Sequence, residues 1–153
     1  MIKKEKKMND DDTFRILEKG SYGVLGTVTP GGAPYGVPLN YCTVDGNIYF
    51  HSATEGKKLG CFKNNNRVSF CVVTRSKVIP EKFDTDFESC IVEGVIDEVS
   101  GEEKFKGLKS LIEKYSEDFF EEGLKFIKKP DKKTKVFRIK IEEISGKASR
   151  PEK

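Results

Sequence analysis

The amino-acid sequence of 153 residues predicts a mainly β fold, a six-stranded antiparallel barrel with peripheral helices. Its apolar runs are short, turns rich in Gly, Pro and Asp separate several of them, and the helical patterns do not alternate regularly with the strands. Regular alternation with long helices would instead predict a parallel α/β sheet. The interior of so small a barrel is filled by its own side chains, so a ligand is expected at the rim or at a subunit interface.

The first part of the chain predicts one helix and three strands. Residues 9–20 read NDDDTFRILEKG, in which acidic residues cap a helix, Phe14 and Leu17 share a face, and a glycine ends it. Apolar runs around the turn PGGAP and the dipeptide DG indicate strands joined as hairpins. The expected strands are residues 22–29, 35–44 and 47–52.

The second part predicts three helices and three strands. Phe105, Leu108 and Ile112 recur at helical spacing. Phe137 and Ile139, in contrast, alternate with charged residues as in a strand. In chain order, we expect a helix over residues 54–66, a strand over 67–73, a loop over 74–87, a strand over 88–99, helices over 102–115 and 117–127, a linker over 128–133 and a strand over 134–146.

Length and charge predict one domain over residues 1–153, with a flexible N-terminal tail at 1–9 and a C-terminal tail at 147–153. The 28 basic and 25 acidic residues leave a net charge of +3, and the excess lies in lysine runs without interleaved aromatic residues. We therefore expect no nucleic-acid partner. No apolar run approaches the roughly 18 residues that cross a bilayer, and no signal peptide is evident. The expected location is cytoplasmic, with no membrane partner.

Cysteine and histidine usage argues against a metal site. The four cysteines form no C-x-x-C pair, and the chain has a single histidine, His51. Common zinc and dithiol motifs are therefore absent, and we expect no bound metal. Three of the cysteines lie in apolar runs, which is typical of buried free thiols in a reducing compartment.

The stretch HSATEGKKLG, residues 51–60, has the composition of a phosphate-binding turn. Ser52 supplies a hydroxyl, Gly56 allows close backbone approach, and Lys57 and Lys58 open the short predicted helix. Free N–H groups at a helix N-terminus together with ammonium groups suit a phosphate dianion. The stretch is not a Walker A loop, because His51 stands where that motif requires a glycine. The alternative is that both lysines are ordinary solvated helix residues.

Six phrases that follow one another along the chain carry a family resemblance. They read ILEKGSYGVLGTV, YGVPLNY, IYFHSATEGKKL, NNNRVSF, VIPEKF and EEISGKA. In this order they resemble the FMN-binding split barrels related to pyridoxamine 5′-phosphate oxidase, and more narrowly the Nim branch of nitroimidazole-resistance proteins. The resemblance implies a homodimeric, FMN-dependent oxidoreductase. It would reduce a small-molecule acceptor such as a nitroaromatic, for example a 5-nitroimidazole.

The resemblance also implies a flavin site at the subunit interface. One strand lays its backbone along the isoalloxazine edge, and the matching residues are Val37, Pro38, Leu39, Asn40 and Tyr41. A second segment, His51, Ser52 and Ala53, covers another part of the flavin, while Lys57 and Lys58 match the basic pair that holds the phosphate. Ser89 matches a polar residue that the second subunit contributes.

His51 is the expected catalytic residue, because the matching histidine of the Nim branch faces the flavin ring. Histidine changes protonation near neutral pH, so it could donate a hydrogen bond or a proton to the acceptor. The alternative is a histidine hydrogen-bonded to backbone at the end of a strand.

Departures from the oxidases keep other functions open. The oxidases grip their substrate with a C-terminal tryptophan and arginine, whereas this chain has no tryptophan and only Arg150 as a candidate for the arginine. Pyridoxamine 5′-phosphate oxidation is therefore the less favoured activity. A non-catalytic flavin- or haem-binding module is the other alternative, with His51 as a possible ligand of haem iron. The pair Lys57 and Lys58 favours a cofactor that carries a phosphate.

Overall fold

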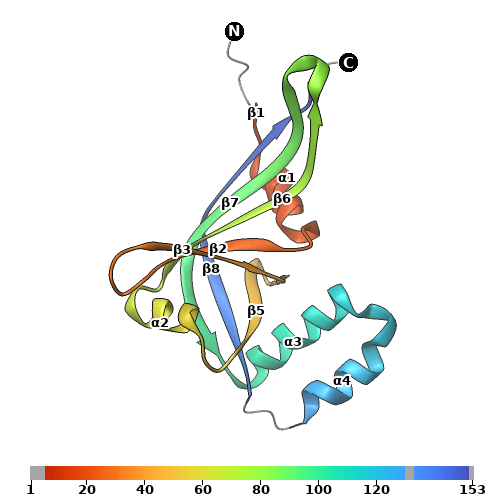
Figure 1. The fold of residues 1–153 in the computed structure, drawn as a ribbon. Coiled ribbons are helices and arrows are strands. Elements are labelled where there is room, and N and C mark those ends of the chain that lie inside the picture. Colours follow the sequence, from red (N-terminus) through yellow and green to blue (C-terminus); the bar gives the residue numbers. More distant parts are fainter. Residues whose placement is uncertain (1–5, 130–132, 152–153) are drawn as a thin grey trace.

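The computed structural model describes residues 6–129 and 133–151, and it folds into one antiparallel sheet of eight strands with helices at its edges (Figure 1). The strands are β1 (Lys6–Lys7), β2 (Gly23–Val28), β3 (Pro34–Leu39), β4 (Cys42–Val44), β5 (Asn47–Ala53), β6 (Arg67–Ile79), β7 (Asp84–Val99) and β8 (Thr134–Ser149). The helices are α1 (Asp10–Lys19), α2 (Lys57–Asn64), α3 (Gly101–Tyr115) and α4 (Phe120–Lys128), with short 3-10 turns η1 (Pro80–Lys82) and η2 (Glu117–Phe119).

The sheet is an open barrel whose two edge strands follow each other in the chain. The strand order is β3-β2-β6-β7-β8-β5-β4, with β1 paired to β8. Only Asn40 and Tyr41 link β3 to β4, although these two strands lie at opposite ends of that order. The predicted mainly β, antiparallel barrel with peripheral helices is confirmed. The sheet has eight strands instead of six because the predicted strand over 35–44 divides at this link and because β1 adds a short strand.

The main core fills the inside of the curved sheet. Leu25, Phe50, Phe70 and Ile139 come from four different strands and are all fully buried. Tyr41 turns inward from the link and packs edge-on against Phe70, with ring centroids 4.9 Å apart. Burial of large side chains such as these contributes about 1.5–3 kcal/mol each. The link between β3 and β4 is therefore anchored by the core that it crosses.

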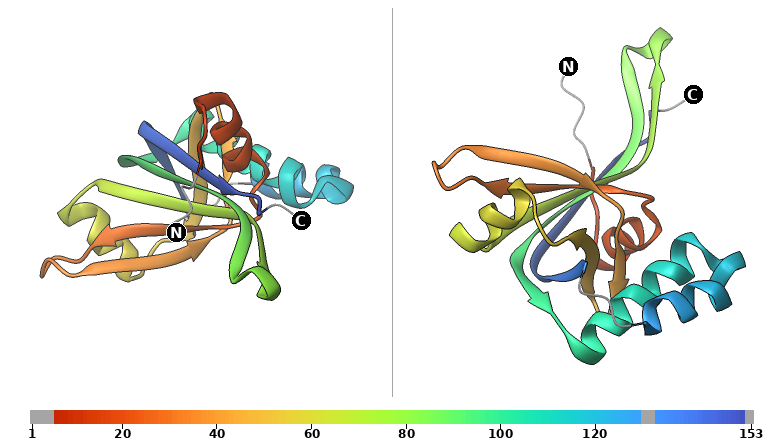
Figure 2. Two further views of the ribbon diagram at one scale, coloured as in Figure 1. Left: turned by 90° about the horizontal axis from the view of Figure 1, so that it is seen from above. Right: turned by 60° about the horizontal axis from the view of Figure 1, so that its bottom comes forward.

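A second, smaller cluster lies between α3 and the outer side of β4, β5 and β8. Its buried residues are Cys42, Tyr49, Val99, Leu111 and Val136. Helix and strands approach closely at Gly107, where an added Cβ would lie 2.9 Å from Tyr49 Cδ2. Helix α4 packs on α3 but stands away from the barrel, so the two helices form a hairpin that projects from it (Figure 2).

The predicted loop over residues 74–87 is wrong. β6 continues to Ile79 and β7 starts at Asp84, and their paired ends form a hairpin that projects beyond the barrel (Figure 1). We call residues 74–87 the arm. Phe83, at the tip of the arm, has a φ of 52° and is 97% exposed.

The termini also differ from the predicted tails, a flexible one over residues 1–9 and a C-terminal one over 147–153. Lys6 and Lys7 pair with Ala148 and Lys147, so parts of both predicted tails lie side by side as strands. Residues 1–5 and 152–153 of these tails, and residues 130–132 of the predicted linker, lie outside the described residues.

The four cysteines are free thiols, and Cys42 and Cys90, which lie in apolar runs, are buried as predicted. Cys71, in the third apolar run, is only half-buried, whereas Cys61, outside these runs, is buried. None of the helices in the described ranges is long and apolar enough to cross a membrane. Residues 6–129 and 133–151 also contain no group of three or more His, Cys, Asp or Glu side chains placed to hold a metal ion.

Candidate functional site

The N-terminus of α2 has the features that bind an anion. Gly56 is its N-cap, with a φ of 145°, and no side chain caps the first turn, which contains no acidic residue. An added Cβ at Gly56 would meet nothing within 4 Å, so the approach to the backbone is open. Lys57 Nζ lies 4.5 Å from the centroid of the Tyr35 ring on β3. Uncapped N–H groups and two lysines fit the phosphate of a cofactor such as FMN.

His51 and Asn40 line one cleft on the side of the barrel that carries α3 and α4. β5 continues to Ala53, one residue beyond the predicted strand, so His51 lies two residues before the end of the strand. His51 is exposed and alternates with the buried residues Phe50 and Ser52, which places its imidazole outside the barrel. Helix α2 and the α3–α4 hairpin lie on opposite sides of β5 (Figures 1 and 2). His51 is thus on the strand between the anion-binding turn and the cleft.

Asn40 is held by a neighbouring turn. Its Nδ2 donates to the Ser21 carbonyl oxygen at 3.1 Å, while the residue stays exposed. The amide group therefore has a backbone partner. This hydrogen bond fixes the orientation of the side chain beside the cleft.

Tyr41 lies in the core, and α3 holds its backbone. Its side chain is fully buried, and its N–H donates to Tyr115 Oη at 3.1 Å. The Tyr41 carbonyl oxygen lies 2.9 Å from both Tyr115 Oη and Lys114 Nζ. Lys114 Nζ also lies 3.8 Å from the centroid of the Tyr41 ring. Partial burial lowers the pKa of Lys114 and raises that of Tyr115. We call Lys114 and Tyr115 the clamp.

The other predicted contact residues are distributed over both faces of their strands. Val37 and Leu39 are half-buried on β3, whereas Pro38 is exposed opposite Val24. Because β3 is an edge strand, Pro38 needs no outer hydrogen-bond partner. Ser52 is buried and donates to the Ala53 carbonyl oxygen at 2.8 Å, so its hydroxyl points away from the side on which His51 lies.

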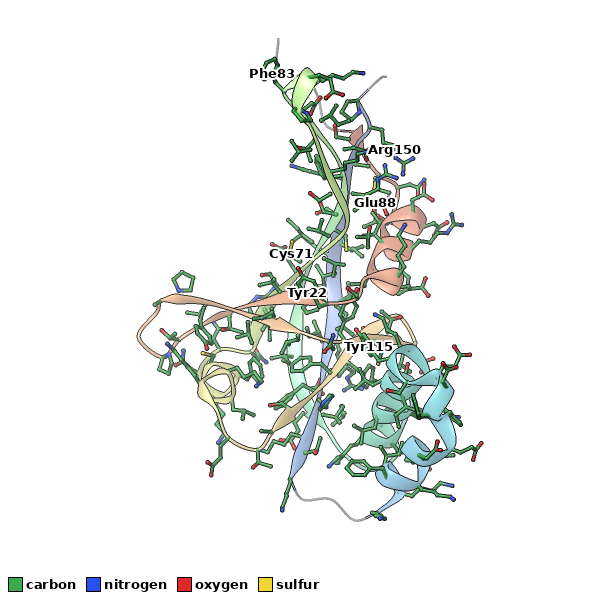
Figure 3. The ribbon with its side chains drawn as sticks, turned by 45° about the vertical axis from the view of Figure 1, so that its right-hand side comes forward. Tyr22, Cys71, Phe83, Glu88, Tyr115 and Arg150 are labelled. Carbon is green, nitrogen blue, oxygen red and sulfur yellow. The ribbon has the colours of Figure 1, made fainter. Side chains whose placement is uncertain are left out.

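Ser89 lies apart from these residues within one chain. It sits half-buried on the outer face of β7, opposite Val73 of β6 and Lys147 of β8. Arg150 does not approach the cleft either, because its Nη2 pairs with Glu88 Oε2 at 3.3 Å. Figure 3 shows Arg150 and Glu88 beside α1, well above Tyr115 at the helical hairpin. Arg150 therefore has a partner remote from the cleft.

Two parts of this site were missed by sequence reasoning. The clamp joins Tyr115 to Tyr41 across 74 residues of chain, and no local pattern marks such a contact. The cleft wall formed by α3 and α4 was predicted only as two amphipathic helices. The available signal in the sequence was the presence of the aromatic residues Phe119 and Phe126, which lie in η2 and α4 and are largely exposed in the structure.

An antiparallel barrel that is open between its edge strands β3 and β4 has the architecture of a split barrel. Residues 9–148 match the family described as pyridoxamine 5′-phosphate oxidase. This match spans most of the chain, which therefore belongs to the pyridoxamine 5′-phosphate oxidase-like family. No curated protein matches the sequence.

Solved structures share this fold at low sequence identity. A candidate 5-nitroimidazole antibiotic resistance protein from Bacteroides thetaiotaomicron has a TM-score of 0.75 and 21% identity, over 96% of this chain and 90% of that one. An FAD-binding protein from Mesorhizobium loti has a TM-score of 0.66 and 23% identity, over 95% and 99% of the two chains. The haem storage protein HutZ from Vibrio cholerae has a TM-score of 0.68 and 14% identity, over 90% and 94%.

Proposed function

We propose that the protein is an FMN-dependent oxidoreductase of the Nim type, which passes electrons to a small acceptor such as a nitroaromatic. The observation that carries this proposal is the uncapped, lysine-bearing N-terminus of α2 beside the strand that presents His51 to a cleft. When bound, FMN would supply the redox chemistry, taking electrons from a reductant and passing them to the acceptor. Membership of the family and likeness to a candidate nitroimidazole-resistance protein support the same choice.

In this proposal Lys57, Lys58 and the first-turn N–H groups of α2 hold the phosphate. Lys58→Ala is expected to weaken FMN binding at least about tenfold, since a hydrogen bond to a charged group contributes about 1.5–3 kcal/mol. Lys63→Ala is the matched control, because Lys63 lies in the last turn of the same helix. The measurement is a fluorescence titration of the cofactor-free protein with FMN and with riboflavin. Equal affinities for the two flavins would contradict the proposal.

His51 is proposed to donate a proton or a hydrogen bond to the acceptor during its reduction. In a His51→Ala protein that still binds FMN, reoxidation of the reduced flavin by a 5-nitroimidazole should slow by about 10²-fold. Stopped-flow absorbance of the flavin measures this rate directly. Unchanged rates with every acceptor that the parent protein reduces would leave His51 a structural residue.

We further propose a homodimer with FMN at its interface, where Ser89 of one chain would complete the site of the other. Val24, Val73 and Ile91 are 42%, 53% and 48% exposed on the outer face of β2, β6 and β7. Val24 pairs with Cys71, which in turn pairs with Ile91, so these side chains form a continuous apolar patch. Patches of this kind mark surfaces that another chain covers.

Light scattering of the purified protein tests the dimer. Ile91→Lys places a charge in the patch and is expected to give monomers with reduced FMN content. A parent protein that is monomeric and still holds one FMN per chain would refute the interface.

A non-catalytic haem- or flavin-binding module is the second candidate, supported by the likeness to a haem storage protein and by the exposed His51. The absorption spectrum separates a haem module from a flavoprotein, because haem gives a Soret band and flavin does not. The rate of flavin reoxidation by an acceptor separates a non-catalytic flavin module from the oxidoreductase. Released cofactor would then be identified by its mass. Oxidation of pyridoxamine 5′-phosphate is the third candidate, and assay of that substrate with the FMN-loaded protein tests it.

A further inference from the structure

The cleft between the α3–α4 hairpin and the barrel has a volume of about 880 Å³. Pockets for small molecules typically measure about 300–1,000 Å³. Its barrel side carries His51, Asn40 and Thr134, while α3 and α4 supply the other walls. Figure 3 shows Tyr115 on the side of the helical hairpin that faces the barrel.

The helical walls are apolar and incompletely covered. Phe105 and Leu108 of α3 and Ile127 of α4 line the cleft, and the lining also includes Phe119 and Phe126. Phe119 and Phe126 are 65% and 71% exposed, and α4, all of whose residues are described, has no buried residue. Helix α4 packs on α3, yet the described residues leave most of the Phe119 and Phe126 rings uncovered. Covering aromatic surface of this kind is favourable, so the cleft suits a flat apolar molecule.

The net charge of the cleft lining indicates which charge a bound aromatic molecule should carry. Lys104, Lys128 and Lys129 line the cleft against the single acid Glu122, which gives 3 − 1 = +2 with His51 neutral. Lys104 Nζ donates to the Thr134 carbonyl oxygen at 2.7 Å, which holds it on the barrel side. Such a lining attracts an anionic group and disfavours a cationic one.

We propose that the α3–α4 cleft binds the electron acceptor, and that this acceptor is a small aromatic molecule with an anionic substituent. The aromatic body lies between the phenylalanine residues of the hairpin, and the anionic group lies towards the lysines. The reducible end then lies beside His51. The proposal rests on the proposed function only in calling the bound molecule an acceptor.

Binding is tested by isothermal titration of the FMN-loaded protein with three probes of one shape, namely 4-nitrobenzoate, 4-nitrobenzyl alcohol and 4-nitrobenzylamine. The anion should bind at least about tenfold more tightly than the amine, a difference of about 1.4 kcal/mol. Similar affinity for all three probes, or no saturable binding of 4-nitrobenzoate, would overturn the proposal.

Two pairs of variants locate the binding site. Phe126→Ala should weaken 4-nitrobenzoate binding about tenfold, whereas Phe83→Ala, which removes an even more exposed ring at the tip of the arm, should not. Lys128→Gln should weaken it severalfold, whereas Lys125→Gln, on the same helix but outside the lining, should not. Equal effects within either pair would refute the site.

Other outcomes distinguish a failure of the acceptor cleft from a failure of the proposed FMN-dependent function. FMN binding without 4-nitrobenzoate binding would refute the cleft and leave the flavin proposal intact. Binding of 4-nitrobenzoate by a protein that does not bind FMN would refute the acceptor role and the flavin proposal, and leave only a ligand site. If Phe126→Ala instead turned a dimer into a monomer, the hairpin would be a contact between chains, and the proposal would fail.

Discussion

Replacing Glu88 with glutamine is expected to lower the free energy of unfolding by about 1–3 kcal/mol at neutral pH. Glu88 is 5% exposed, accepts a hydrogen bond from Thr74 Oγ1 at 2.6 Å, and pairs with Lys19 and Arg150. Hydrogen bonds to charged groups contribute about 1.5–3 kcal/mol each. Lys19 and Arg150 side chains are 58% and 63% exposed, so both regain water when the carboxylate is removed. The loss therefore stays below the 3–5 kcal/mol typical of a fully buried pair.

The pH dependence of this loss follows from the direction of the pKa shift. Hydrogen bonds from Lys19 and Thr74 hold the pKa of Glu88 in the folded protein below its ordinary value of 4.5. The folded state therefore binds the carboxylate proton more weakly than the unfolded state does. The stabilisation is fully present above about pH 4.5 and is lost as the pH falls through the lowered pKa. The difference between parent and variant should shrink over that range.

Urea unfolding at several pH values, with thermal melts as a check, measures this difference. For a chain of this length about 1 kcal/mol corresponds to about 2–4 °C in Tm, so the variant should melt about 2–12 °C lower at pH 7. Glu142→Gln is the control, because Glu142 and its partner Arg67 are 47% and 68% exposed and their pair contributes at most about 1 kcal/mol. A Glu88→Gln protein as stable as the parent at pH 7 would refute the reasoning.

Three further predictions concern packing and protonation. Gly107→Ala should lower stability by about 1–3 kcal/mol in urea unfolding, because the new Cβ would lie 2.9 Å from Tyr49 Cδ2. An unchanged urea midpoint would show that α3 can shift away from Tyr49 without loss of stability. Tyr115→Phe should cost about 1–3 kcal/mol by the same assay, since its hydroxyl contacts both backbone groups of Tyr41. Burial raises the pKa of Cys90 to about 12, so iodoacetamide at pH 9 should not label this thiol in the native protein. Mass spectrometry of the digested protein measures the labelling, and a carbamidomethylated Cys90 would contradict the prediction.

Strands with one buried face could be predicted from the sequence, and strands exposed on both faces could not. In β2 and in the part of β6 that lies in the barrel, buried positions alternate with exposed or half-buried ones. Apolar residues occupy most of the buried positions, so the sequence shows the two-residue period of a strand. Residues 74–79, in contrast, are exposed or half-buried throughout, so the strand has no apolar period to detect. Their polar composition indicated a loop. The pairing of Ile79 with Asp84 across η1 continues the β6–β7 hairpin beyond the barrel, after a shift of register between Val73 and Arg75.

The link at Asn40 and Tyr41 was hidden for a different reason. The segment over residues 35–44 has the composition of one continuous strand, and its division depends on where the two edges of the sheet lie. Sheet closure is a property of the whole fold, so no local pattern reports it. Lys57 and Lys58, however, form a local motif within one helical turn, and the open N-terminus of α2 was predicted from it.

Helix α3 connects the cleft with the link between the edge strands. Its middle turns place Leu108 and Ile112 in the cleft wall, and its last turn places Tyr115 on the backbone of Tyr41, next to Asn40. Gly107 seats the same helix closely on the sheet. A change in the cleft wall therefore alters which ligand fits, whereas a change in the clamp alters the position of Asn40 itself. Because one rigid element carries both, a displacement of α3 would change ligand fit and the geometry of the link together.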